Sequence, residues 1–171
     1  MLAIKEEKLS LDELRDYASY FLERNYNVTL EIPITQNNRL TRSLGRYIHT
    51  IAGEPKGIQL SGRLLRYGTN NVIIDVLKHE LIHYALHILG KPYKDGQPYF
   101  ENELRKHGSP STNTKRVGIY YVIQCTRCEN KSLTKTKSVI KNIKNYRSRC
   151  CHSDLIHVGN VIYDGETKVY V

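Results

Sequence analysis

The chain has 171 residues, 40% of them hydrophobic, and a net charge of +9. This size allows one domain, or a small domain with an appended module. The first residues are charged where a secretion signal needs an apolar stretch, and aliphatic runs such as Val72-Ile73-Ile74 are far too short to cross a bilayer. We therefore exclude a membrane protein and expect a soluble, cytoplasmic one. No feature of the sequence indicates oligomerisation, so a monomer is expected.

The N-terminal half alternates between helical and extended patterns. A capping box, Ser10-x-x-Glu13, precedes apolar residues at helical spacing and predicts a helix from residue 11 to about 25. Alternation of apolar and polar residues predicts strands at 28–32, 45–51 and 57–60. Together these segments predict a small, mostly antiparallel sheet.

Two more helices should follow. The second is expected from Asn71 to Leu89, where Gly90 and then a proline end it. A short third helix should start near residue 98 and end at Gly108, with proline at its start and glycine past its end.

A polar, turn-rich stretch over residues 109–115 predicts a linker. We accordingly expect a first domain over residues 1–110 and a small β module over 116–171. Strands at 117–123 and 161–171 should flank the cysteines of that module.

The second predicted helix carries the motif H-E-x-x-H at residues 79–83. Helical residues four apart share one face, so His79 and His83 can offer two imidazoles to one tetrahedral zinc ion. Glu80 can then act as general base for a water whose pKa the metal lowers. The plain alternative is a chance match on an amphipathic helix, although apolar residues surround the motif. His87, one turn further on, is expected to be a neighbouring or surface histidine and not a ligand.

Two helical imidazoles leave a catalytic zinc ion one protein ligand short. The downstream candidates are Asp95, Glu101, Glu103 and His107. Asp95 lies in a turn just after the helix, where plain turn chemistry also explains it. Glu101 and Glu103 lie on the next predicted helix, where a solvated helix face explains them equally well. The residues alone leave the third ligand open.

The four cysteines fall as Cys125-x-x-Cys128 and an adjacent pair, Cys150-Cys151. In a reducing compartment this arrangement favours a metal site over disulfides. The first pair is a good zinc knuckle, but the side chains of neighbouring cysteines tend to diverge. Three arrangements stay open: a site with one of Cys150 and Cys151 plus His152, a distorted site with all four cysteines, or a ribbon fold without metal.

The positive charge is concentrated near these cysteines. Ten basic residues and one acidic residue lie between Lys115 and Arg149, while the rest of the chain is balanced. Such a surface, with tyrosines interleaved, suits nucleic-acid phosphates, although a solvated basic hairpin explains it as well. The candidate nucleic-acid contacts are Arg127, Lys131, Lys135, Lys137, Lys141, Lys144, Arg147 and Arg149.

The residues around the helical motif resemble the SprT-like zinc metallopeptidase family. The resemblance runs from about residue 10 to 157 and includes a C-terminal zinc ribbon. It rests on Asn38-Arg39-Leu40, Gly45-Arg46-Tyr47, Ile58-x-Leu60, residues 79–87, Gly90-Lys91-Pro92-Tyr93, Phe100 and Gly108-Ser109-Pro110. It implies an α+β, minigluzincin-like domain with a small sheet packed on the active helix, followed by a small β module.

The resemblance also implies roles. His79 and His83 match the metal ligands of the family, and Glu80 matches its catalytic glutamate. The usual third ligand is a histidine in the loop after this helix, and Asp95, a competent zinc ligand, holds that place here. Members such as the Spartan proteases cut proteins bound or crosslinked to DNA.

We therefore expect a zinc metalloendopeptidase with one catalytic and possibly one structural zinc ion. It should act on protein substrates at DNA, which the basic module would bind without sequence preference. The departure at Asp95 and the altered second cysteine pair keep a non-catalytic, zinc-stabilised DNA-binding or adaptor protein as the alternative. A metalloenzyme that acts on smaller amides is a second alternative.

Overall fold

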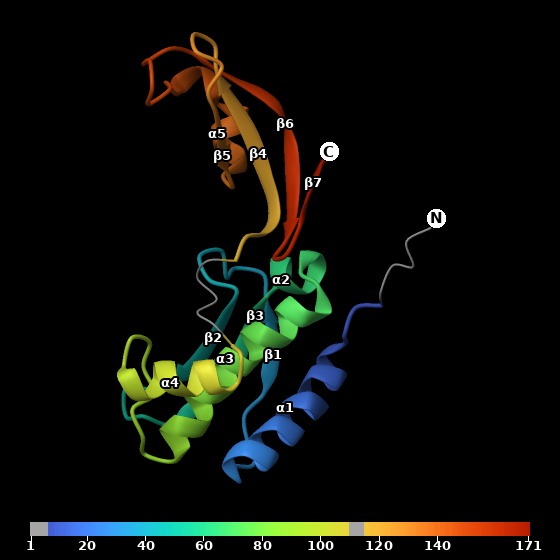
Figure 1. The fold of residues 1–171 in the computed structure, drawn as a ribbon, viewed down its shortest axis with the longest axis vertical. Coiled ribbons are helices and arrows are strands. Elements are labelled where there is room, and N and C mark those ends of the chain that lie inside the picture. Colours follow the sequence, from blue (N-terminus) through green and yellow to red (C-terminus); the bar gives the residue numbers. More distant parts are fainter. Residues whose placement is uncertain (1–6, 110–114) are drawn as a thin grey trace. The chain divides into compact units, whose positions relative to one another are not determined.

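The structure is a computed structural model that describes residues 7–109 and 115–171. The chain divides into two compact units, Met1–Lys115 and Arg116–Val171 (Figure 1). Residues 110–114, which make up most of the predicted linker, lie outside the described residues. The predicted α+β class is confirmed.

In its described part, the first unit combines a three-stranded sheet with the helices α1 to α4 (Figure 1). Strand β1 pairs in parallel with β3, and β2 pairs antiparallel with β3 on its other side, so β2 is an edge strand. The elements are α1 (Leu11–Tyr26), β1 (Ile34–Asn37), β2 (Gly45–His49), β3 (Pro55–Ser61), α2 (Gly62–Tyr67), α3 (Asn70–Ile88) and α4 (Pro98–Lys106).

Helix α3 is the centre of this unit. It packs on α1, α4 and the sheet, and most of its residues from Val72 to Leu86 are buried. A helix that is apolar on nearly every side belongs in a core, and that position carries the 79–83 motif into the interior. The predictions of α1, α3 and α4 are confirmed to within a residue or two at their ends.

The predicted strand at residues 28–32 is wrong, because these residues form no strand and β1 begins only at Ile34. Val28, Leu30 and Ile32 are buried and their neighbours are exposed, which produces the alternation seen in the sequence. This extended segment is held by a side chain instead of a neighbouring strand. The Tyr84 hydroxyl donates to the carbonyl of Thr29 at 2.9 Å and accepts the N–H of residue 31 at 3.3 Å.

The second unit is an antiparallel sheet with the strand order β5-β4-β6-β7. The predicted strand at 161–171 proves to be parts of two strands, because the Asp164 carboxylate accepts the N–H groups of Glu166 and Thr167 in a tight turn. The elements are β4 (Val117–Cys125), β5 (Lys131–Thr134), α5 (Lys137–Lys141), the 3-10 helix η2 (Ile143–Asn145), β6 (Leu155–Asp164) and β7 (Lys168–Tyr170).

The apolar core of this second unit is small. One cluster of buried residues contains Tyr120, Val122 and Val161, with Tyr163 packed against it. A β module with so little buried apolar surface needs a further source of stability, such as a metal ion. In neither unit do the described residues form a helix that is both long and apolar enough to cross a bilayer.

Candidate metal centres

Three potential ligand atoms converge at the motif of α3. The Nε2 atoms of His79 and His83 are 3.0 Å apart, and Asp95 Oδ1 lies 3.1 Å from the first and 3.6 Å from the second. Tetrahedral zinc with bonds of about 2.0–2.2 Å places its ligand atoms roughly 3.3 Å apart. The three separations therefore fit one zinc ion. Two imidazole nitrogens this close to each other need a shared proton or a cation between them.

The loop after α3 and helix α4 hold the two imidazole rings. His83 Nδ1 hydrogen-bonds to the carbonyl of Tyr93, which leaves its Nε2 available as a ligand. Phe100 of α4 is fully buried and stacks on His83 at 4.1 Å, while His79 meets the same ring edge-on at 5.3 Å. His79 Nδ1 is buried without a hydrogen-bond partner in the described residues. One aromatic ring thus fixes both imidazoles.

Of the four candidates for a third ligand, the structure brings Asp95 to the imidazoles. Glu101 instead accepts the N–H of Gly96 at 2.9 Å and so closes the turn that presents Asp95. Glu103 accepts a hydrogen bond from the Tyr26 hydroxyl, and His107 packs against the same tyrosine ring. These contacts place Glu103 and His107 in a separate cluster.

The protonation of His83 and Asp95 suits metal binding, whereas that of His79 competes with it. Burial, together with the neighbouring His79, lowers the pKa of the His83 imidazole to about 4. The hydrogen bond between Asp95 and His79 keeps the pKa of the Asp95 carboxyl group below its usual value. Burial also lowers the pKa of His79, but Asp95 and Glu80 outweigh this and raise it overall. A neutral imidazole and an ionised carboxylate are the forms that bind zinc.

Glu80 is buried between α3 and β2. Its Oε2 accepts the backbone N–H of Tyr47 at 2.8 Å, and burial raises the pKa of its carboxyl group to about 7. The strand approaches so closely because residue 45 is glycine. A Cβ at Gly45 would lie 2.7 Å from Glu80 Oε1 and 2.7 Å from Val76 Cγ1.

We therefore expect Gly45→Ala to destabilise the first unit by about 1–3 kcal/mol, the usual cost of overpacking a filled interior. Thermal unfolding would measure the change, with Ser43→Ala at the rim of the same pocket as control. The loss should shrink when Glu80→Ala is present too, because that change makes room for the new methyl group. Equal losses in both backgrounds would contradict a clash with Glu80.

The three ligand atoms and Glu80 open into one pocket of about 340 Å³. It is lined by Ser43, Gly45, Arg46, Tyr47, His49, His79, Glu80, His83, Tyr93, Lys94 and Asp95. The wall opposite α3 is formed by the edge strand β2, so the pocket lies between a helix and a strand edge.

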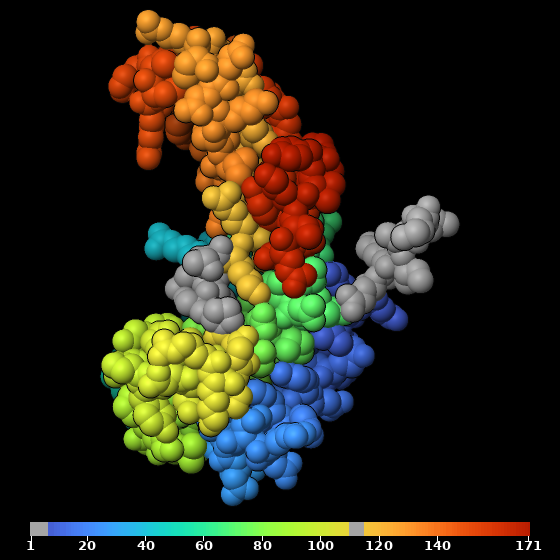
Figure 2. Space-filling model, viewed as in Figure 1, coloured from blue at the N-terminus to red at the C-terminus, as the bar shows by residue number. Residues whose placement is uncertain are grey.

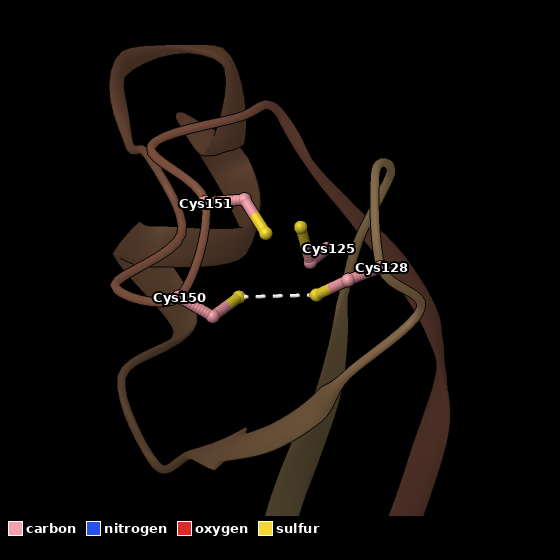
Figure 3. A group of neighbouring side chains, drawn as sticks. All are labelled: Cys125, Cys128, Cys150 and Cys151. Atoms are coloured by element: carbon pink, nitrogen blue, oxygen red, sulfur yellow. Dashed lines mark hydrogen bonds between the residues drawn. The ribbon is translucent and has the colours of Figure 1, made fainter.

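The four cysteines form a second group of potential ligands (Figure 3). All four sulfur atoms lie within 4.8 Å of one another, and the Sγ atoms of Cys128 and Cys150 are 3.4 Å apart. Tetrahedral zinc with Zn–S bonds of about 2.3 Å needs sulfurs roughly 3.8 Å apart. The cluster is thus compatible with a zinc ribbon.

Adjacent Cys150 and Cys151 both face the cluster, although neighbouring side chains tend to diverge (Figure 3). His152 lies next to them in the left-handed region, with φ of 50°, and its N–H donates to the carbonyl of Ser148 at 2.9 Å. This tight turn closes the loop that carries both sulfurs. Of the three arrangements left open by the sequence, the one with four cysteines matches these contacts, and His152 is outside the group.

Hydrogen bonds to Cys125 favour its thiolate form. Its Sγ is 3.3 Å from the hydroxyl oxygen of buried Ser148 and accepts the N–H of Arg127 at 3.4 Å. The contact with Ser148, followed by those with backbone N–H groups, lowers the pKa of Cys125 to about 6. A thiolate at neutral pH is the form that binds zinc.

The eight basic candidates for nucleic-acid binding are all exposed, and most lie between β5 and β6 (orange in Figure 2). Arg147 is paired with Asp154 at 3.1 Å, and the Lys135 ammonium lies over the ring of Tyr120. Basic residues also border a hollow of about 650 Å³ on the sheet of this unit, where no acidic side chain is among the lining residues.

That hollow contains two cations outside the predicted set. Arg116 lies over the ring of Tyr163, and Lys168 lies over that of Tyr170. Neither is among the eight predicted contacts, because Arg116 and Lys168 lie at the two ends of the module, away from the cysteines on which that prediction centred. The period of two in β6 and β7, which places Tyr163 and Tyr170 on one face, is the signal that could have found them.

Comparison with known proteins gives a consistent result. The model of the SprT-like family matches residues 12–114. A protein from Bacillus cereus named Protein SprT-like is 32% identical over 124 residues, which cover 70% of this chain and 77% of the relative. A Staphylococcus aureus protein of the same name is 28% identical over 148 residues, with coverages of 82% and 90%. The resemblance found from the motifs is confirmed.

Proposed function

Since the chain belongs to the SprT-like family, we propose that it is a zinc metalloendopeptidase that cleaves proteins associated with DNA. His79, His83 and Asp95 hold the ion, and Glu80 is the general base. One observation carries this proposal: three ligand atoms converge beside a buried carboxyl group in a pocket open to an edge strand.

Zinc bound at this site would polarise the scissile carbonyl and lower the pKa of a water molecule. Glu80 takes the proton of that water as its oxygen attacks the carbonyl carbon. Its Oε2 is held by the N–H of Tyr47, and its pKa of about 7 suits a group that both accepts and returns a proton near neutral pH. The proton then passes to the amide nitrogen as the peptide bond breaks.

The edge strand β2 supports a peptide substrate. Among residues 7–109, β3 is the one strand that pairs with β2, so the outer edge of β2 can accept an extended segment by main-chain hydrogen bonds. Gly45, Tyr47 and His49 line the pocket along that edge. A peptide in this position would pass beside the three ligand atoms, which favours cleavage within a chain over release of its end residue.

The second unit supports attachment to DNA. Its exposed cations, and the basic hollow on its sheet, suit phosphate contacts that depend on charge and not on base sequence. Such binding would concentrate the enzyme where its protein substrates are. The affinity should fall steeply as salt rises.

The matched pair Glu80→Gln and Glu23→Gln tests the catalytic proposal. Glu80→Gln should lower cleavage of a DNA-bound protein about 10³-fold or more, because it removes the proton acceptor and keeps the shape of the side chain. Zinc content and DNA retention should be unchanged. Glu23→Gln, on the exposed side of α1, should cleave at the wild-type rate.

Two results would contradict this proposal in different ways. If the wild type cleaves no protein with or without DNA, the non-catalytic DNA-binding or adaptor function is favoured. If it cleaves only short amides, at a rate that DNA does not change, the second alternative is favoured.

A further inference from the structure

Four aromatic rings form a cluster beside the three ligand atoms. His87 stacks on Tyr93 at 4.3 Å with an interplanar angle of 12°, and His49 meets His87 edge-on at 5.2 Å. Tyr47 contacts both histidine rings, at 5.7 and 5.8 Å. The mechanism proposed above, which uses the zinc ligands and Glu80, gives these four side chains no role.

Tyr47 is held at both of its ends. Its backbone N–H donates to Glu80 Oε2 at 2.8 Å, and its hydroxyl is 2.7 Å from His87 Nδ1. Its ring meets Tyr84 edge-on at 6.0 Å. Tyr47 lines the same pocket as His79, His83 and Glu80, but from β2 and not from α3. A residue of the pocket lining thus carries a hydroxyl that His87 holds in place.

The hydroxyl of Tyr47 keeps its proton at neutral pH. Burial raises its pKa, and the neighbouring Tyr93 and Tyr84 raise it further. A protonated phenol is a hydrogen-bond donor, and donors fixed in a pocket stabilise negative charge that develops on a substrate.

His87 is tied to the metal centre through Tyr93. The carbonyl of Tyr93 receives the hydrogen bond of His83, and the ring of the same residue stacks on His87. Burial and the nearby His49 lower the pKa of His87, so its imidazole is neutral. In the tautomer with a proton on Nδ1, His87 donates to the Tyr47 oxygen and leaves the phenolic hydrogen free to point into the pocket.

We propose that Tyr47 is a catalytic residue whose hydroxyl donates a hydrogen bond to the oxygen of the scissile carbonyl as it becomes negatively charged, and that His87 positions this hydroxyl. The proposal rests on the proposed peptidase function. No proton is transferred from Tyr47: the water oxygen bonds to the carbonyl carbon, Glu80 takes the water proton, and the phenol O–H bond stays intact.

The substitution Tyr47→Phe tests this role, because it removes the hydroxyl and keeps the ring. The kcat should fall about 10- to 100-fold, in the range for loss of one hydrogen-bond donor to an oxyanion or somewhat below it. KM, zinc content and the unfolding temperature should stay at wild-type values. Tyr20→Phe, on the exposed face of α1, is the matched control.

A second readout does not depend on turnover. A phosphinic peptide mimics the tetrahedral intermediate, so its dissociation constant, measured by calorimetry, should rise by the same factor as kcat falls in Tyr47→Phe. Binding of a cleaved product peptide should not change. The role of His87 is tested by two variants. His87→Phe keeps a ring that can stack but should lower kcat, whereas His87→Asn should restore part of the lost kcat because its amide group lies near the position of Nδ1.

The outcomes separate this inference from the proposed function. If Glu80→Gln is inactive and Tyr47→Phe keeps kcat within twofold, the peptidase function stands and the role of Tyr47 is overturned. Loss of zinc or of stability in Tyr47→Phe would also overturn it, in favour of a structural role. If the wild type itself does not cleave, the proposed function fails first.

Discussion

The substitution His83→Ala is expected to remove zinc from the first unit and to abolish peptide hydrolysis. Structural zinc sites with four ligands bind with about 10–16 kcal/mol, so one ligand contributes about 3 kcal/mol, or more than a hundredfold in affinity. Elemental analysis should find two zinc ions per chain in the wild type and one in the variant. Binding should also weaken as the pH falls, because His79, whose pKa is raised, takes up a proton that competes with the metal.

The variant His157→Ala provides the control for this measurement. His157 is an exposed histidine of the second unit, 2.9 Å from Asn160, and its loss should leave both ions in place. The first unit should remain folded in His83→Ala, since its core is formed mainly by α1, α3, α4 and the sheet. Two zinc ions per chain in His83→Ala would disprove the assignment of this ligand.

The substitution Cys128→Ser is expected to lower the stability of the second unit strongly. Metal binding of the size given above is comparable to the whole stability of a small domain, about 5–15 kcal/mol. The core around Tyr120, Val122 and Val161 is too small to replace it. We expect the second unit to lose protection against amide hydrogen exchange while the first unit keeps it.

A matched control for this experiment is Ser138→Ala, an exposed change in α5 of the same unit. It should keep both the zinc ion and the protection. If Cys128→Ser loses zinc and stays protected, the sheet is held by strand pairing and packing alone. The arrangement without a required metal would then be the correct one.

Much of the first unit could be predicted because its signals are local. Ser10 and Glu13 form the capping box that begins α1, with hydrogen bonds in both directions. The motif at residues 79–83 needs only the geometry of a helix to place two imidazoles on one face. For these elements, local helix geometry and capping explain both the pattern in the sequence and the structure.

Other features depend on contacts between distant residues. The alternation at residues 28–32 shows which side chains face the core, but a strand also needs a neighbouring strand to pair with. Here the Tyr84 hydroxyl makes the backbone hydrogen bonds that such a strand would make. Helix α2 has six residues, too few for a periodic pattern. The convergence of Cys150 and Cys151 depends on the left-handed turn at His152, which nothing in the local sequence requires.

The position of Phe100 implies that the two candidate metal centres differ in whether their ligands are ordered before an ion binds. Its ring supports both imidazoles from within a finished core, so the cradle for the ion exists before the ion arrives. The second unit, in contrast, would gain much of its order together with the zinc ion that we propose its four cysteines bind. In a cell short of zinc, the first unit would therefore stay folded without its proposed activity, and would regain that activity once zinc returned. The second unit would be exposed to degradation in the same interval, so zinc scarcity would remove the proposed attachment to DNA before it damaged the proposed cleavage site.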